Sequence, residues 1–227
     1  MAVLPDLLRP GLWVVFVGTS VGVRSAQAGR YYANPTNRFW ELVEAAELTD
    51  GSGITAERDS ELLDHQIGIT DLVKSRAASS DSHLEPGDHN VAGFLRRIEA
   101  NPPTILAFNG REPARQVAHH LGEPVPAEGP LPWRVAGALG YRLPSSSGAN
   151  ARRPAAYKME AWRRFGRWAR ERGTAGHEPV RGSSPRLQRM AAEDVGDLGF
   201  VWQTGGAIPA AGESPQPRES ARSPICR

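Results

Sequence analysis

The stretch LWVVFVGTSVG, residues 12–22, decides the fold of this 227-residue chain. Its first part, Leu12 to Val17, is a continuous apolar run rich in valine that ends at Gly18. Runs of this kind are typical of strands buried on both faces, as in parallel sheets. The second part, the GTSVG loop of residues 18–22, has mostly small side chains, which let a ligand approach the backbone closely. We therefore expect a buried parallel strand that leads into a candidate ligand-binding loop.

Strand and helix patterns alternate along the chain on both sides of residue 100. Thr104–Phe108 is a second apolar run, closed by Asn109 and Gly110 and followed by a helical pattern at Glu112–Leu121. Trp133–Leu143 is a weaker strand pattern, which we interpret as a last strand that feeds a small polar loop. This alternation predicts an α/β layered domain with a mainly parallel sheet and ligands outside the carboxyl ends of its strands. Further helices are predicted at 37–46, at 91–98 and in a closing segment after Pro154.

Composition divides the chain into one domain, residues 1–172, and a tail, residues 173–227. The tail is rich in Gly, Pro, Ser, Ala and Arg, so we expect it to be mostly disordered. No apolar stretch approaches the roughly 18 to 20 residues that span a bilayer, and the N-terminus lacks a secretory signal pattern. We expect a soluble, intracellular protein without a membrane partner.

Charge and cysteine content restrict the chemistry further. The single cysteine, Cys226, excludes a disulfide framework, a cysteine-ligated zinc site and an iron–sulfur cluster within one chain. His119 and His120 are adjacent rather than four residues apart, so they do not form a metal-binding pair, and no metal is expected. The net charge of +2 permits contact with a polyanion without requiring it.

Asp71 is a candidate catalytic base, because it is a lone carboxylate among the apolar residues of IGITDLVK (67–74). Purely structural interpretations stay open for each candidate segment. Asp71 could instead cap the N-terminus of a helix or form an ion pair with Lys74. Tyr31 and Tyr32 could simply pack on the core. Four segments at the expected strand ends would form any cleft: Gly18–Asn34, the segment around Asp71, Asn109-Gly110 and Ser145–Asn150.

Five motifs follow one another in a fixed order over roughly residues 5–172. They are LRPGLWVVFVGTSVG (8–22), AGRYYANPTNRFWELV (28–43), IGITDLVK (67–74), TILAFNG (104–110) and LPSSSGANAR (143–152). In this order they resemble the mismatch-specific uracil-DNA glycosylase and thymine-DNA glycosylase branch of the uracil-DNA glycosylase superfamily. The last two motifs are more similar to those of the thymine-specific members.

The resemblance implies a three-layer α/β/α domain and a base-flipping enzyme. Such an enzyme rotates a mismatched or deaminated base out of double-stranded DNA and hydrolyses its N-glycosidic bond with water, as the first step of base excision repair. It implies no cofactor, and DNA as the partner of a monomer. The expected location is the cytoplasm, at the nucleoid if the source is bacterial.

The resemblance also implies roles for individual residues. Gly18, Thr19 and Gly22 would lie beside the flipped pyrimidine, and the ring of Tyr32 would stack on it. Stacking of this kind supplies about 1 to 3 kcal/mol and tolerates several bases. The loop that follows residue 144 would provide substrate contacts through Ser145 and Ser146, and DNA contacts through Ser147, Gly148, Ala149, Asn150 and Arg152.

The first motif departs from the family pattern at the residue that positions the attacking water. The family usually has Asn there, in Gly-Ile-Asn-Pro-Gly, whereas this chain has Ser20. A serine hydroxyl can hold a water but is no base at neutral pH. We therefore expect Asp71 to be the main catalytic carboxylate and Ser20 a secondary water ligand. As an anion, Asp71 should face the sugar, water or an amino-bearing base edge, because it would repel a pyrimidine carbonyl.

Two further features bear on the reaction. Ala149 stands where family members place Leu or Arg to fill the gap left by the flipped base, so we expect a preference for G·U and G·T over A·U pairs. Lys74 and Lys158 are the only lysines, so we expect a monofunctional enzyme without the Schiff-base chemistry of a lyase.

Two other functions fit the same sequence. One is a catalytically impaired relative that binds mismatched DNA without turnover, which Ser20 would permit. The other is an α/β enzyme acting on free nucleosides or nucleotides, for which the serine-rich loop beside arginines would have no evident purpose.

Overall fold

A computed structural model describes residues 3–125, 127–148 and 153–173 of the chain. Strands and helices alternate along the described segments, as the apolar runs predict. The elements are β1 (Val14–Ser20), α1 (Val23–Ala28), α2 (Phe39–Ala45), η1 (Ala56–His65), β2 (Ile67–Val73), η2 (Asp81–His83), η3 (Pro86–Asp88), α3 (Val91–Ala100), β3 (Ile105–Asn109), α4 (Arg111–Leu121), β4 (Gly129–Val135), β5 (Ala138–Leu143) and α5 (Ala155–Gly173).

The described strands form one five-stranded sheet in the order β2-β1-β3-β5-β4. Strand β1 lies between two parallel neighbours, so that Val14 is in register with both Ile67 and Ile105. Strand β5 is parallel to β3, and only β4 runs antiparallel, at the edge. The prediction of a buried parallel strand at residues 12–17 is therefore confirmed.

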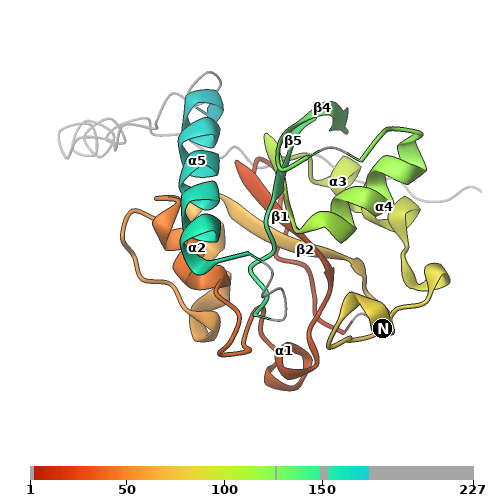
Figure 1. Cartoon of the computed structure of the whole chain (residues 1–227), viewed down its shortest axis with the longest axis horizontal. Coiled ribbons are helices and arrows are strands. Elements are labelled where there is room, and N and C mark those ends of the chain that lie inside the picture. Colours follow the sequence, from red (N-terminus) through yellow and green to blue (C-terminus); the bar gives the residue numbers. More distant parts are fainter. Residues whose placement is uncertain (1–2, 126, 149–152, 174–227) are drawn as a thin grey trace, which may run out of the picture. The chain divides into compact units, whose positions relative to one another are not determined.

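Helices cover both faces of the sheet, which confirms the three-layer α/β/α architecture (Figure 1). Val14 and Phe16 of β1 face α2 and α5, where they pack in one apolar cluster with Trp162. Val15 and Val17 face the opposite cluster, which α3 and α4 contribute to. Because both faces of β1 are buried, its sequence is apolar at every position from Val14 to Val17 rather than at alternate ones.

The prediction of a single last strand over Trp133–Leu143 is wrong. This segment forms a hairpin, in which β4 ends at Val135 and β5 begins at Ala138. The two residues between them have positive φ, 48° at Ala136 and 81° at Gly137, as a tight two-residue hairpin turn requires. The apolar residues on both sides of this turn hid it, so β4 was missed.

The closing helix α5 ends at Gly173, the first residue of the predicted tail, and the rest of that tail, residues 174–227, lies outside the described residues. No helix of the described segments is long and apolar enough to cross a membrane.

Candidate functional site

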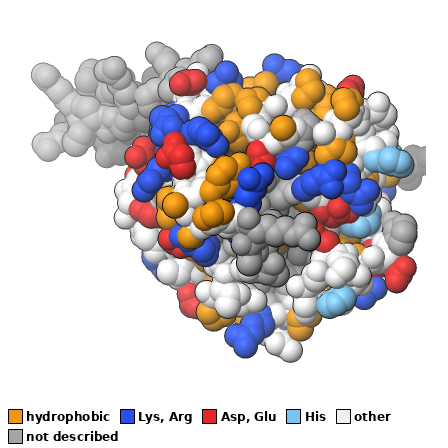
Figure 2. Space-filling model, viewed as in Figure 1, with side chains coloured by type: hydrophobic (Ala, Val, Ile, Leu, Met, Phe, Trp, Pro, Cys, Tyr) orange, Lys and Arg blue, Asp and Glu red, His pale blue; other side chains and the backbone are white. Residues whose placement is uncertain are grey.

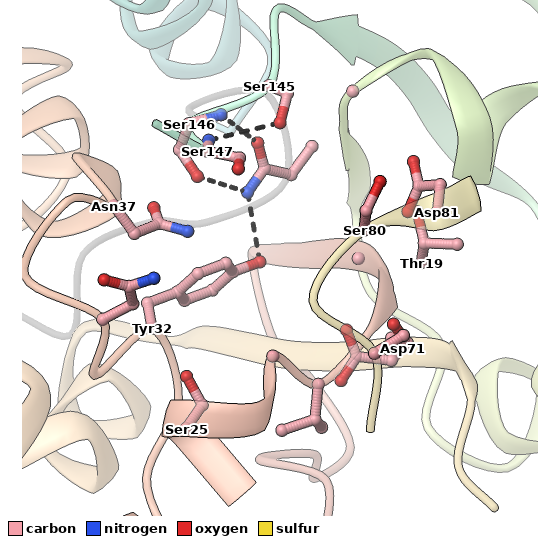
Figure 3. A pocket seen from close by; sticks show the side chains of 18 of the residues that line it. Thr19, Ser25, Tyr32, Asn37, Asp71, Ser80, Asp81, Ser145, Ser146 and Ser147 are labelled. Atoms are coloured by element: carbon pink, nitrogen blue, oxygen red, sulfur yellow. Dashed lines mark hydrogen bonds between the residues drawn. The ribbon is translucent and has the colours of Figure 1, made fainter. Parts of the chain in front are cut away.

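A cavity of about 800 Å³ opens at the carboxyl ends of β1, β2 and β3. All four segments that the sequence predicted as cleft-forming contribute to it, and residues 78–81 add a wall that the sequence did not indicate. In Figure 3, Ser145, Ser146 and Ser147 lie above Tyr32 and Asp71, while Thr19 and Asp81 lie to one side. The parallel sheet brings these segments together because parallel strands end at one edge.

Asp71 reaches the cavity from inside β2, not from a loop or a helix N-terminus. Its partner across the strand pair is Gly18 of β1. A Cβ atom on residue 18 would lie 2.2 Å from the Asp71 Oδ1 atom, so only glycine leaves room for this carboxylate. The N-cap interpretation of Asp71 is therefore wrong, and the small residue at position 18 has a steric reason.

The Asp71 carboxylate is buried and incompletely partnered. The residue is 3% exposed, and its Oδ2 atom has no hydrogen-bond partner among the described residues. Burial raises the pKa of Asp71 to about 7, although the positive charge of Lys74 opposes this rise. A buried carboxyl group that titrates near neutral pH and faces a cavity is a candidate acid or base.

Lys74 does not form the predicted ion pair with Asp71 in the described structure. Its Nζ atom lies 2.7 Å from Oδ1 of Asp6 and donates to the Tyr31 hydroxyl at 3.0 Å. The Tyr31 hydroxyl in turn hydrogen-bonds to Asp71, so Lys74 reaches Asp71 through a tyrosine.

Tyr32 is a supported aromatic platform on the wall of the cavity. Its ring stacks on Phe39 with 3.8 Å between centroids and 13° between planes. Its hydroxyl accepts a hydrogen bond of 3.2 Å from Asn109 Nδ2, and burial raises its pKa. The backbone at Tyr32 has a φ of 52°, an unusual conformation for a bulky residue that the stacking and the hydrogen bond hold in place.

Asn109 connects Tyr32 to the loop formed by Ser145, Ser146 and Ser147, called the serine loop below. Asn109 was not among the site residues predicted from the sequence. Its Nδ2 donates to Ser146 Oγ at 2.8 Å, and its Oδ1 accepts from the Ser146 backbone at 2.9 Å. The signal for Asn109 in the sequence was its position directly at the end of the second apolar run. Ser146 is fully buried, so its polar groups serve this network.

Two other contacts hold the serine loop at the rim of the cavity. Lys158 of α5 donates to the Ser147 carbonyl at 2.9 Å. Gly148 lies so close to the Thr36 carbonyl that a Cβ atom would come within 2.6 Å of it. Three of the predicted DNA-contacting residues, Ala149, Asn150 and Arg152, lie outside the described residues.

The remaining predicted residues, Thr19, Ser20, Gly22 and Ser145, all line the cavity. Asp81, which sequence reasoning missed, hydrogen-bonds to Thr19, and burial raises the pKa of this second carboxyl group. In Figure 2, several Arg and Lys side chains lie across the upper half of this face, and a few more lie near its lower edge. The described residues contain no group of three His, Cys, Asp or Glu side chains that could hold a metal ion.

Comparisons with known proteins agree with this geometry. The model of the Uracil DNA glycosylase superfamily matches residues 5–166. Among solved structures, the chain is similar to a solution NMR structure of a "putative Uracil DNA glycosylase" from Methanosarcina acetivorans. The two share 26% sequence identity with a TM-score of 0.52, over 74% of this chain and 96% of that one. The family match spans more than two thirds of the sequence and includes every segment that forms the cavity, so this chain belongs to the uracil DNA glycosylase superfamily.

Proposed function

We propose that this protein is a monofunctional DNA glycosylase that flips uracil out of mismatched DNA and excises it, with thymine and other deaminated bases as further substrates. The observation that carries the proposal is the buried Asp71 carboxylate, which has one oxygen without a partner among the described residues and lines the same cavity as Tyr32. Family membership supports the class of reaction, and the residues of this cavity suggest how it proceeds.

In the proposed mechanism the flipped base stacks on Tyr32, whose far side Phe39 supports. The bond between C1′ of the sugar and the base nitrogen breaks, and its electron pair leaves with the base. The Asp71 carboxylate stabilises the positive charge that develops on the sugar and aligns a water, with Ser20 as a second ligand. The water oxygen bonds to C1′, its proton passes to Asp71 and then to solvent, and an abasic site remains.

The positions of both lysines support the monofunctional assignment. A lyase needs a free amine that reaches C1′ to form a Schiff base. Lys74 is engaged with Asp6 and Tyr31, and Lys158 with the Ser147 carbonyl. Neither is among the described residues that line the cavity. We therefore expect borohydride to trap no covalent protein–DNA adduct.

The proposed preference for mismatched bases rests on Ala149 and remains a sequence argument. A methyl side chain fills the gap left by a flipped base poorly, so extrusion should depend on a base pair that is already weak. Faster excision from G·U and G·T than from A·U duplexes is the expected result, and equal rates on A·U and G·U would contradict it.

The decisive experiment is single-turnover excision from labelled duplexes that carry U or T opposite G, U opposite A, and hypoxanthine opposite T. Wild type should yield abasic product, and Asp71→Asn should lose about 100-fold or more in rate. Asp81→Asn is the matched control, because it removes another carboxylate that lines the cavity and should lose far less. Most of the wild-type rate in Asp71→Asn would refute the catalytic assignment.

A second candidate function is a mismatch-binding relative without turnover, which the replacement of Asn by Ser20 favours. Tight binding of mismatched duplexes with no product on any of them would establish that function instead. If a free nucleoside competed as well as duplex DNA, the protein would act on nucleosides.

A further inference from the structure

We propose that Asp6 and Lys74 are positioning residues for Asp71: Asp6 holds the Lys74 ammonium group away from Asp71, which leaves this carboxylate without a direct cationic partner. This inference rests on the proposed function of Asp71. It adds a control element outside the cavity, and one of its two residues, Asp6, lies on a segment that none of the five sequence motifs includes.

Asp6 lies on the N-terminal segment, which the backbone fixes against β2. The amide and carbonyl of Leu7 pair with those of Ile69 at 3.0 and 3.1 Å, and the amide of Val3 donates to the Lys74 carbonyl at 2.9 Å. This backbone pairing places Asp6 beside Thr70, which precedes Asp71, and Lys74, which directly follows β2.

Three partners anchor the Asp6 carboxylate. Its Oδ1 lies 2.7 Å from Lys74 Nζ and accepts from Thr70 Oγ1 at 2.9 Å. Its Oδ2 lies 2.8 Å from Arg97 Nε. The side chains of Asp6 and Lys74 are 13% and 16% exposed, so water screens their attraction only partly.

The charged and titratable groups around Asp71 are few. They are Lys74 directly after β2, Asp6 on the N-terminal segment, Arg97 on α3, and the hydroxyls of Tyr31 and Tyr32. Arg97 donates to the Asp71 carbonyl at 2.6 Å, and therefore faces the backbone of this residue. Lys74 is the cation with the largest effect on the pKa of Asp71, and Asp6 acts in the opposite direction.

Loss of Asp6 would therefore change the charge state of Asp71 in a defined direction. A Lys74 ammonium group without its carboxylate partner would act more strongly on Asp71 through Tyr31 and favour its anion. An opposite charge at close range lowers a carboxyl pKa by about 1 to 3 units. Since Asp6 also repels the Asp71 anion directly, its removal lowers the pKa of Asp71 by both routes.

The test measures the pH dependence of single-turnover excision and, separately, the titration of the Asp71 carboxyl carbon by NMR of 13C-aspartate-labelled protein. The Asp71→Asn spectrum assigns the resonance. Asp6→Asn should move both midpoints down by about one pH unit, and Lys74→Met should move them up. A merely structural role would lower the rate at every pH and leave the midpoints in place.

Asp59→Asn is the matched control, because the Asp59 Oδ2 accepts from the Tyr31 backbone at 2.8 Å but does not contact Lys74. Its midpoints should equal those of wild type, and a shift as large as that of Asp6→Asn would overturn the proposal. Unchanged midpoints in Asp6→Asn would also overturn it. If Asp6→Asn does not fold, the test rests on Lys74→Met. Midpoints of Lys74→Met that do not lie above those of wild type would then overturn the proposal.

The two proposals fail in different ways. Full excision by Asp71→Asn would refute the catalytic role of Asp71. The NMR titration midpoints of Asp71 would still show whether Asp6 and Lys74 control its pKa. Loss of excision in Asp71→Asn together with unchanged midpoints in Asp6→Asn would refute only the positioning role.

Discussion

Replacing Gly18 by alanine should separate catalysis from stability. The new Cβ atom would lie 2.2 Å from Asp71 Oδ1 and 3.4 Å from its Cγ. The carboxylate must then move by about 1 Å to reach an ordinary van der Waals contact. A displacement of that size at a reacting centre costs roughly 100-fold in rate, so we expect single-turnover excision to fall by about two orders of magnitude.

The cost in stability should be much smaller. The clash involves the end of a side chain that can rotate, and leaving a preferred rotamer costs about 0.5 to 1.5 kcal/mol. Replacing a glycine within a strand by alanine raises the free energy of unfolding by about 0.5 to 1 kcal/mol, because alanine loses less conformational entropy on folding. The free energy of unfolding should therefore change by less than about 1.5 kcal/mol, measured by urea denaturation with tryptophan fluorescence.

Gly22→Ala is the control within the same motif. Its Cβ atom would lie 3.9 Å from Ser25 Oγ, an ordinary contact, so its loss of rate should be at least about tenfold smaller than that of Gly18→Ala. If Gly18→Ala excised uracil at the wild-type rate, Asp71 would not act from the position seen in the structure.

Three other perturbations test separate parts of the structure. The excision rate of wild type should rise with pH through about 7, because burial raises the pKa of Asp71 to about 7 and the anion is the proposed active form. The rate should fall roughly tenfold per pH unit below about 6, and a flat profile between pH 5 and 8 would exclude this titration. Asn109→Ala leaves two buried polar groups of Ser146 without partners and should lower the free energy of unfolding by about 2 to 4 kcal/mol, as urea denaturation would show. Gly166→Ala would place a Cβ atom against the Ala46 carbonyl, where backbone cannot rotate away. It should cost about 2 kcal/mol or more in a thermal melt without altering the rate of the folded enzyme.

Local sequence patterns were sufficient for most of the architecture. Strands β1 and β3 are buried on both faces, so their runs are apolar throughout and stand out from the helical spacing around them. Strand β4 alternates regularly between more exposed and more buried positions, but Pro130 and Pro132 weaken its strand signal. The apolar residues on both sides of the turn at Ala136 and Gly137 hid the hairpin. The edge of the sheet was thus the part that local pattern predicted least well.

The sequence by itself determined four of the segments that form the site, because order along the chain and the parallel sheet place their ends at one edge. It did not indicate the wall that residues 78–81 add. It could not determine that Asp71 lies over Gly18, that Asn109 joins Tyr32 to Ser146, or that Asp6 holds Lys74. These contacts join residues 37 to 77 positions apart. Their geometry follows from strand register and from burial, and both exist only once the layers have packed. Tertiary structure therefore decided which carboxylate is paired and which is left free for chemistry.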